Sequence, residues 1–261
     1  MTWLGSLPAW EIFPLFAVLT LLLTVVIDTA LRRQILTDDV RTKASPTAAT
    51  TLQALATIYA VLVAFVIVDE YTQLRDTQSQ VATKAADLGV VFENSRNLKP
   101  ADAARIQAAT VQYARVTVSQ GIPELVQSSK PSPQSDTALE GIYRVVATIE
   151  PTSESGKVAY QQILTALAGV SQTRTNLINA AKASIPSSLF FILAVLAIAV
   201  LAVGTMMDTR HRRSHLLILA ALALGLSMTL ALVAALDYPF RGFIHIDTGP
   251  ITQFIQVRAA R

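Results

Sequence analysis

Cysteine is absent from this chain, so disulfides, thiol catalysis and thiolate metal sites are excluded. Charged residues are also scarce, because Asp, Glu, Lys and Arg make up 15% of the 261 residues, against roughly 25% in an average soluble protein. Apolar side chains account for 52%. This balance is typical of a protein that lies in a lipid bilayer. The net charge of +3 is too small, and the basic residues are too dispersed, to predict a nucleic-acid partner.

The chain also lacks common enzyme signatures, including the P-loop, HExxH and GxSxG motifs. Its nearest approach to a metal site is His211 with His215, whose four-residue spacing could clamp an ion on a helix. Three arginines share that segment and repel a cation, so we interpret it as a basic turn that faces lipid headgroups. The sequence therefore predicts no enzymatic activity, no metal site and no cofactor. An enzyme with an unrecognised site between the spans is the weakest alternative.

Four apolar stretches are long enough to cross a membrane as helices: residues 12–30, 51–68, 186–207 and 216–236. The second contains 18 consecutive residues without a charge, about 27 Å of helix. The first lacks the positively charged start of a secretory signal and is too long for one, so we expect it to be retained as a span. Asp28, one turn before Arg32, is interpreted as half of an interfacial ion pair, with a role in an ion pathway as the alternative.

The stretch between the second and third spans has the composition of a soluble domain. Leu74, Val81 and Leu88 recur every seven residues and predict a stripe for helix packing. Gly121, followed by Pro123, predicts the end of a later helix. No segment shows the bounded two-residue alternation of a strand, so we expect the domain to be entirely helical.

These patterns predict an all-α integral membrane protein of four transmembrane helices, with a helical soluble domain inserted between spans two and three. The expected parts are residues 1–68, two spans joined by a basic loop; 69–185, the helical domain; 186–236, two further spans; and 237–261, an elbow and tail. The loops after the first and third spans hold four and three Lys or Arg, whereas the N-terminal tail holds none. By the positive-inside rule we expect these loops in the cytoplasm. Both termini and the helical domain would then be extracytoplasmic, in a multi-pass protein of the cell (inner) membrane.

The second span has two unequal faces when it is drawn as a helix of about 100° per residue. One side is bulky and apolar, whereas the other is small and partly polar. This small face consists of Thr50, Gln53, Thr57, Ala60, Ala64 and Val68. A helix surrounded only by lipid does not need such asymmetry, so we expect the small face to pack against another helix or to line a pore. Gln53 and Thr57 favour the pore, because polar side chains in a span need partners.

Two acids, Asp69 and Glu70, follow the second span where it leaves the membrane. In a ring of subunits they would form an acidic outer vestibule that concentrates cations. The alternative is that a helix leaving the bilayer simply becomes polar there. Both acids project away from the small face, which favours this second interpretation.

Three segments resemble the bestrophin-like family of bacterial membrane proteins: YAVLVAFVIV at residues 59–68 with the polar helix after it, RTNLINAAKASIPSSLF at 174–190, and LDYPFRG at 236–242. The resemblance implies a four-span subunit that assembles into a ring around a central ion path, as bestrophin channels do with their second span.

Two features depart from this family. Its members carry an aromatic residue and an acid on the polar helix, where this chain has Asp69-Glu70 and Lys84-Ala85-Ala86. Bestrophins also place both termini and the bulk domain in the cytoplasm, opposite to the orientation that the loop charges predict. No acids here match the bestrophin calcium clasp, so neither calcium gating nor anion selectivity is transferred.

The LDYPFRG segment also has a physical interpretation as a structural elbow. Asp237 ends the fourth span, Pro239 prevents the helix from continuing, and Gly242 permits a tight turn. Phe240 would lie at the level of the lipid headgroups.

The leading functional prediction is an oligomeric ion channel in which the second spans line a central pore. Its partners would be the lipid bilayer, other copies of the chain and inorganic ions. The polar residues of the small face would form the cytoplasmic half of the pore, and its last three residues a narrow apolar gate that closes by dewetting. The acids at the outer exit favour cations slightly. The alternative is a non-conducting membrane-anchored sensor or scaffold whose outer helical domain binds a partner.

Overall fold

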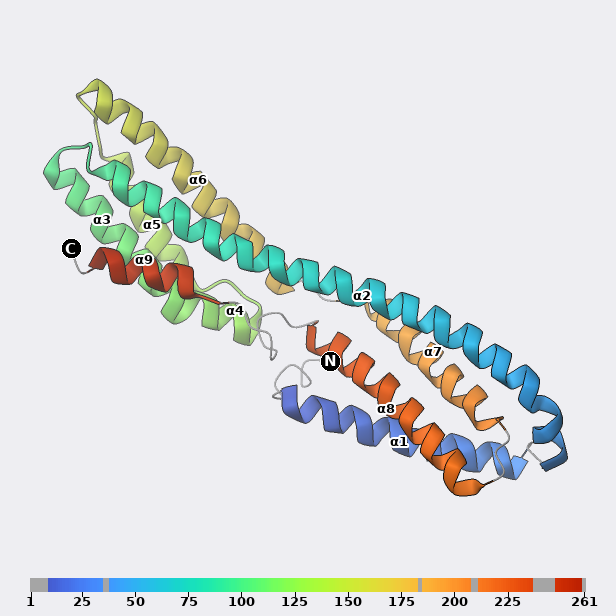
Figure 1. Cartoon of the computed structure of the whole chain (residues 1–261). Coiled ribbons are helices and arrows are strands. Elements are labelled where there is room, and N and C mark those ends of the chain that lie inside the picture. The colour runs from blue at the N-terminus through green and yellow to red at the C-terminus, as the bar shows by residue number, and fades with distance from the viewer. Residues whose placement is uncertain (1–8, 35–37, 183–184, 208–210, 237–246, 260–261) are drawn as a thin grey trace. The chain divides into compact units, whose positions relative to one another are not determined.

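The computed structural model describes residues 9–34, 38–182, 185–207, 211–236 and 247–259, and every regular element within them is a helix (Figure 1). The elements are α1 (Ala9–Gln34), α2 (Asp38–Ser95), α3 (Pro100–Val116), the π-helix η2 (Thr117–Gly121), α4 (Ile122–Ser128), α5 (Pro133–Ala147), α6 (Glu154–Lys182), α7 (Ser187–Thr205), α8 (Arg212–Leu236) and α9 (Gly249–Ala259). The prediction of an all-α chain is therefore confirmed for the described residues.

The chain divides into two compact units, with a boundary inside α2 after Thr72. The membrane unit contains α1, α2 up to Thr72, α7 and α8, whereas the helical domain contains α2 from Gln73, α3 to α6, and α9. Within the described residues, the four helices α1, α2, α7 and α8 are long and apolar enough to cross a membrane. The segment expected as a C-terminal tail contains α9, which belongs to the helical domain.

The membrane unit packs around an apolar cluster to which α2, α7 and α8 contribute, while α1 lies along α8 and α7 (Figure 1). Small residues hold two of these helices close together. Ala223, Ser227 and Ala231 are buried on one side of α8. On α7, a Cβ added to Gly204 would lie 3.2 Å from two leucine side chains of α8. Close backbone approach of this kind supplies the dispersion contacts that drive helix association in lipid.

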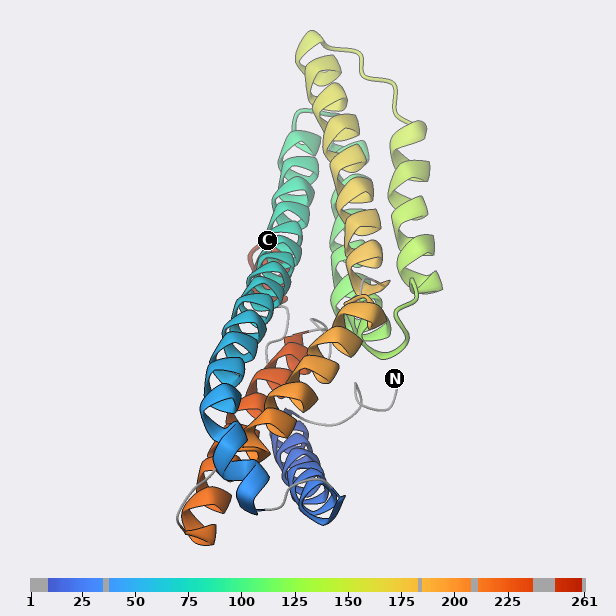
Figure 2. The same ribbon diagram turned by 90° about the vertical axis from the view of Figure 1, so that its right-hand side faces the viewer.

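The helical domain has a continuous apolar core between α2, α3, α5 and α6 (Figure 2). The predicted stripe on α2 is confirmed, since Leu74, Val81 and Leu88 expose only 8%, 1% and 0% of their surface. α9 closes one side of this core: Phe254 packs edge-on against Phe92 of α2, with ring centroids 6.1 Å apart. The heptad stripe therefore marks where the other helices of the domain pack on α2.

One predicted helix end is wrong. Gly121 is not a cap, because its φ of −58° and ψ of −56° are helical and the chain continues into α4. The N–H of Ile122 donates to the carbonyl of Thr117, which is the wider spacing of a π turn. In a regular helix, Pro123 would clash with the carbonyl four residues earlier, and a π turn displaces that carbonyl. The helix ends instead at Ser129, whose φ of 55° is left-handed.

A second boundary also differs from its prediction. α8 begins at Arg212, so His215 lies inside a helix and not in a polar turn. Arginine is a good helix former and histidine an acceptable one, so the polarity of this segment did not mark a break in the helix.

Candidate functional site

The bulky side of α2 packs within the membrane unit. Tyr59, Val63 and Val66 are buried there, in one apolar cluster with side chains of α7 and α8. The hydroxyl of Tyr59 also forms a hydrogen bond with the hydroxyl of Thr229 on α8, at 2.7 Å. This bond and the packing around it fix how α2 is rotated about its own axis.

The small face of α2 points away from these helices, and all six of its residues are exposed in the subunit. Val68, at its outer end, is 64% exposed. The hydroxyls of Thr50 and Thr57 donate to carbonyls of their own helix, at 2.9 Å to Thr47 and 2.8 Å to Gln53. Their oxygens keep lone pairs for other partners. The membrane unit therefore leaves this face available to another copy of the chain, to lipid or to water.

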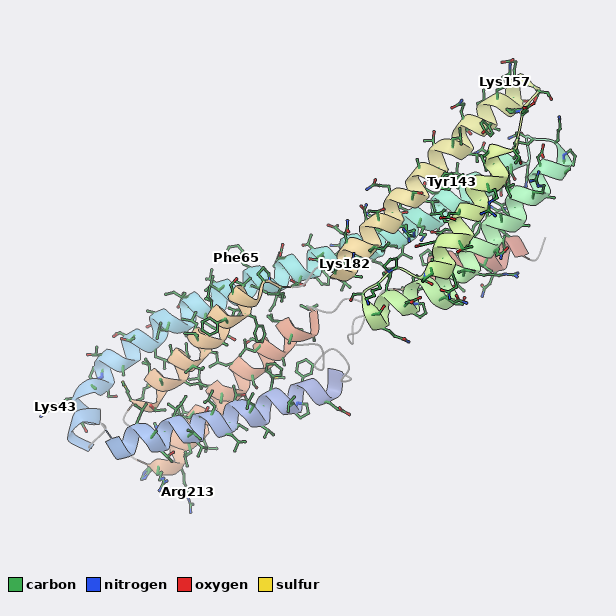
Figure 3. The ribbon with its side chains drawn as sticks, turned by 180° about the vertical axis from the view of Figure 1, so that it is seen from behind. Lys43, Phe65, Tyr143, Lys157, Lys182 and Arg213 are labelled. Carbon is green, nitrogen blue, oxygen red and sulfur yellow. The ribbon has the colours of Figure 1, made fainter. Side chains whose placement is uncertain are left out.

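Next to the small face, the exposed surface of α2 carries three bulky apolar side chains. Ile58, Val61 and Phe65 are 51%, 49% and 70% exposed. Phe65 follows Ala64 in sequence and therefore points about 100° further round the helix. Its ring projects away from the other helices of the unit (Figure 3). Large apolar side chains suit contact with lipid chains, so the exposed side of α2 has a bulky sector and a small sector next to each other.

The two predicted vestibule acids differ in their surroundings. Asp69 is exposed, whereas Glu70 is 8% exposed and lies on the same side of α2 as Tyr59 and Val66. Of the two, Asp69 is the one that solvent and ions can reach in the subunit.

A buried polar pair joins α1 to α8. Asp28 and His215 are 3% and 2% exposed, and the Nε2 of His215 lies 3.3 Å from a carboxylate oxygen of Asp28. Thr24, one turn before Asp28, is also buried and donates to the carbonyl of Thr20 at 2.7 Å. The side chain of Arg32, the predicted partner of Asp28, lies outside the described side chains. The structure thus provides Asp28 with a partner on another helix, as an acid within a span requires.

A positional signal in the sequence points toward this pair. In the predicted four-span arrangement, Asp28 lies near the end of the first span and His215 near the start of the fourth, so alternating spans would bring both to the same side of the membrane. Figure 3 shows Lys43 and Arg213 together at one end of the membrane unit, as this arrangement requires. Many residues share that level, however, so position alone does not select the pair.

Two further groups of residues considered in the sequence remain, the histidine pair and the elbow. His211 is exposed while His215 is buried against Asp28, and no three His, Asp or Glu side chains of the described residues gather as metal ligands do. The residues of the predicted elbow lie outside the described residues: Asp237, Pro239, Phe240 and Gly242.

Comparison with known proteins identifies the family. The family model of the bestrophin-like domain matches residues 15–251, from within α1 to within α9. A search of curated proteins finds no match.

The fold is similar to solved structures of a bacterial bestrophin homolog from Klebsiella pneumoniae. One single-residue variant gives a TM-score of 0.67 at 11% identity, covering 95% of this chain and 99% of that chain. A second variant gives 0.68 at 13%, covering 96% of both chains. The structure phased with zinc gives 0.67 at 14%, covering 94% and 96%. At such identities the likeness concerns the fold alone, but the family model spans nearly the whole chain. This chain therefore belongs to the bestrophin-like family.

Proposed function

We propose that this chain is one subunit of an oligomeric ion channel in the cell (inner) membrane, and that α2 lines its pore. The supporting observation is the exposed small face. Within the subunit α2 packs through its bulky side at Tyr59 and leaves Ala60 and Ala64 uncovered. Membership of the bestrophin-like family, which is known for ion channels, supports the same function.

A ring of copies that turn their small faces to a common axis would enclose a narrow path. In its polar half, the hydroxyls of Thr50 and Thr57 and the amide of Gln53 can replace water around an ion. In its apolar half, Ala60, Ala64 and Val68 offer no hydrogen bonds, so a narrow pore there empties of water and closes. Hydroxyls and amides serve ions of either sign. Asp69 is exposed at the outer end but projects away from the small face, so it favours cations only slightly.

The apolar half can be tested with polar substitutions. Ala64→Asn and Val68→Asn each add an amide that keeps water in the narrow segment, so we expect each to raise ion flux several-fold. The measurement is flux through proteoliposomes that contain the purified protein, or conductance in planar bilayers.

The neighbouring residue provides a matched control. Phe65 is 70% exposed but lies about 100° round the helix from Ala64, in the bulky sector. Phe65→Asn should therefore leave flux unchanged. Unaltered flux in both small-face variants, or an equal rise in Phe65→Asn, would contradict a pore lined by this face.

A second candidate function is a membrane-anchored scaffold whose helical domain binds a partner. It is favoured by a hollow of about 670 Å³ on that domain, lined by α3, η2 and α5 and including Gln112, Gln120 and Arg144. A hollow of this size can receive the side chains of another protein. The number of subunits distinguishes the two functions. A ring-forming oligomer, measured by light scattering or native mass spectrometry, supports the channel. A monomer or dimer without ion flux supports the scaffold. Neither proposal includes an enzymatic step.

A further inference from the structure

A small cavity inside the helical domain has an unusual lining. It measures about 20 Å³ and lies between α2, η2, α4 and α6 and the segment that leads into α5. All its lining residues belong to the helical domain. Two of them are cations, Lys84 and Arg174, and the others are apolar or carry hydroxyls.

Lys84 is the group that most needs a partner. It is 3% exposed, and its Nζ lies 4.9 Å from the centre of the Tyr113 ring. No carboxylate or carbonyl of the described residues accepts a hydrogen bond from it. A lysine ammonium has three N–H donors, and contact with an aromatic ring compensates only part of its lost hydration.

Two hydroxyls near Lys84 also lack a hydrogen-bond partner of normal geometry among the described residues. They are the buried hydroxyls of Tyr113 and Thr117. Leaving a buried donor unpaired is unfavourable, so native structures rarely keep such groups without water or an ion. Thr117 lines the cavity, and Tyr113 lies against Lys84. The hydroxyl oxygens here can accept hydrogen bonds, but none of them carries the negative charge that would neutralise Lys84.

The charges around the cavity also lack a balancing negative group. Arg174 on α6 pairs with Asp136 on α5, so that acid is already engaged. Tyr113 on α3 stays neutral, because burial raises its pKa to about 12 although the nearby hydroxyls of Thr117 and Ser135 oppose this. Arg174 and Tyr113 are thus the titratable groups that face Lys84, and neither neutralises it.

We propose that this cavity binds a single small monovalent anion of halide size, held by Lys84 with the Thr117 hydroxyl. A water molecule offers two lone pairs and no charge, whereas an anion accepts from both groups and neutralises the ammonium. The volume of about 20 Å³ suits one small particle, on the scale of a water molecule.

The π turn explains why there is room at this point. π turns often mark functional sites, because the wider turn displaces backbone and side chains. Here Thr117 begins the π turn and Gly121 ends it, and both line the cavity. A Cβ added to Gly121 would lie 3.3 Å from the Ser135 hydroxyl, so a larger residue there would press on the cavity wall.

Binding should depend on pH through Lys84. Burial, assisted by the charge of Arg174, lowers the pKa of Lys84 to about 7. The anion therefore meets a charged lysine below pH 7 and a neutral one well above it, so binding strengthens as the pH falls through about 7.

The test uses the full-length protein in detergent and follows thermal unfolding in KCl or KBr against potassium gluconate at equal ionic strength. We expect the halides to raise the Tm by several degrees at pH 6 and by clearly less at pH 8.5. Lys84→Met should abolish this difference, and Thr117→Val should reduce it. Lys157→Met is the matched control, since Lys157 is exposed on α6 and pairs only with Glu154 among the described residues (Figure 3).

Bromide also permits a direct observation, because its anomalous scattering locates it in a crystal. A bromide peak beside the Nζ of Lys84 supports the site, even if Lys84→Met does not fold. The proposal is overturned if no peak appears there, or if the halide-dependent shift of the Tm is the same in the wild-type protein and in Thr117→Val and Lys84→Met.

Discussion

Lys84 links the stability of the helical domain to pH. Burial and then the charge of Arg174 lower its pKa from 10.5 to about 7 in the folded chain. Between these values the unfolded chain binds more protons than the folded chain, so the free energy of unfolding rises with pH across this window. Below pH 7 both states are charged and the cost of burying the ammonium is present in full. That cost is on the order of a few kcal/mol, at about 1.4 kcal/mol for each unit of the pKa difference.

Lys84→Met should remove this pH dependence. In gluconate buffer without halide, we expect the variant to unfold at a higher temperature than the wild type at pH 6 and to show a flatter Tm between pH 7 and 10. Lys157→Met, whose ammonium is exposed, should retain the slope of the wild type. Parallel curves of Tm against pH in the wild type and Lys84→Met would show that Lys84 is not the group that titrates.

The contact between Asp28 and His215 joins two helices that are far apart in the sequence. Both residues make further interactions, so a double-mutant cycle is needed to isolate their own coupling. We expect Asp28→Asn and His215→Gln each to lower the Tm and to be coupled by about 0.5–3 kcal/mol in the cycle. His211→Gln, on an exposed residue four positions earlier, should have little effect. Strictly additive effects would mean that the two side chains do not stabilise each other.

At the scale of helices, the close contact between α7 and α8 depends on the glycine at position 204, which has no side chain. A Cβ at Gly204 would lie 3.2 Å from two leucines, whereas a Cβ at Gly225 would have no atom within 4 Å. Gly204→Leu should therefore overpack the contact and destabilise the subunit by about 1–3 kcal/mol. Gly225→Leu is the matched control, and in thermal unfolding it should lie close to the wild type. Equal losses in the two variants would contradict this account.

Features that depend on local pattern were the ones that sequence could predict. The apolar spans follow from length and composition, and the stripe of Leu74, Val81 and Leu88 follows from a seven-residue period. The continuation of the helix past Gly121 did not follow, because Pro123 is tolerated only where a π turn absorbs it. The π turn packs against α5, which follows it in the chain, and such a contact between separate elements is not visible in a local window of sequence.

The candidate sites show the same division. The small face of α2 was recognisable from helical periodicity, but only the fold shows that the subunit leaves it exposed. Asp28 and His215 are 187 positions apart, and no local spacing joins them. The burial of Lys84 could not be predicted either, because an isolated lysine on an amphipathic helix normally lies in solvent.

At the scale of the whole molecule, the loop charges and the family resemblance predict opposite orientations in the membrane. The positive-inside rule puts the basic loop near Arg213 in the cytoplasm and the helical domain outside it. The absence of cysteine makes this testable without removing native thiols. We expect Lys157→Cys, on an exposed residue of α6, to react with a membrane-impermeant maleimide on intact spheroplasts. Arg213→Cys, exposed in the first turn of α8, should react only after permeabilisation, and the wild type should not react at all.

The opposite labelling pattern would reverse the orientation of the subunit and also the direction of the proposed pore. If Arg213→Cys reacts on intact spheroplasts and Lys157→Cys does not, the helical domain lies in the cytoplasm, as in bestrophins. The polar half of the small face at Thr50 and Thr57 would then open to the outside, and the apolar half at Ala64 and Val68 would lie on the cytoplasmic side. The chain would continue from this apolar half into the helical domain in the cytoplasm. Cytoplasmic pH and anions would then act on Lys84 from the same side of the membrane as the gate.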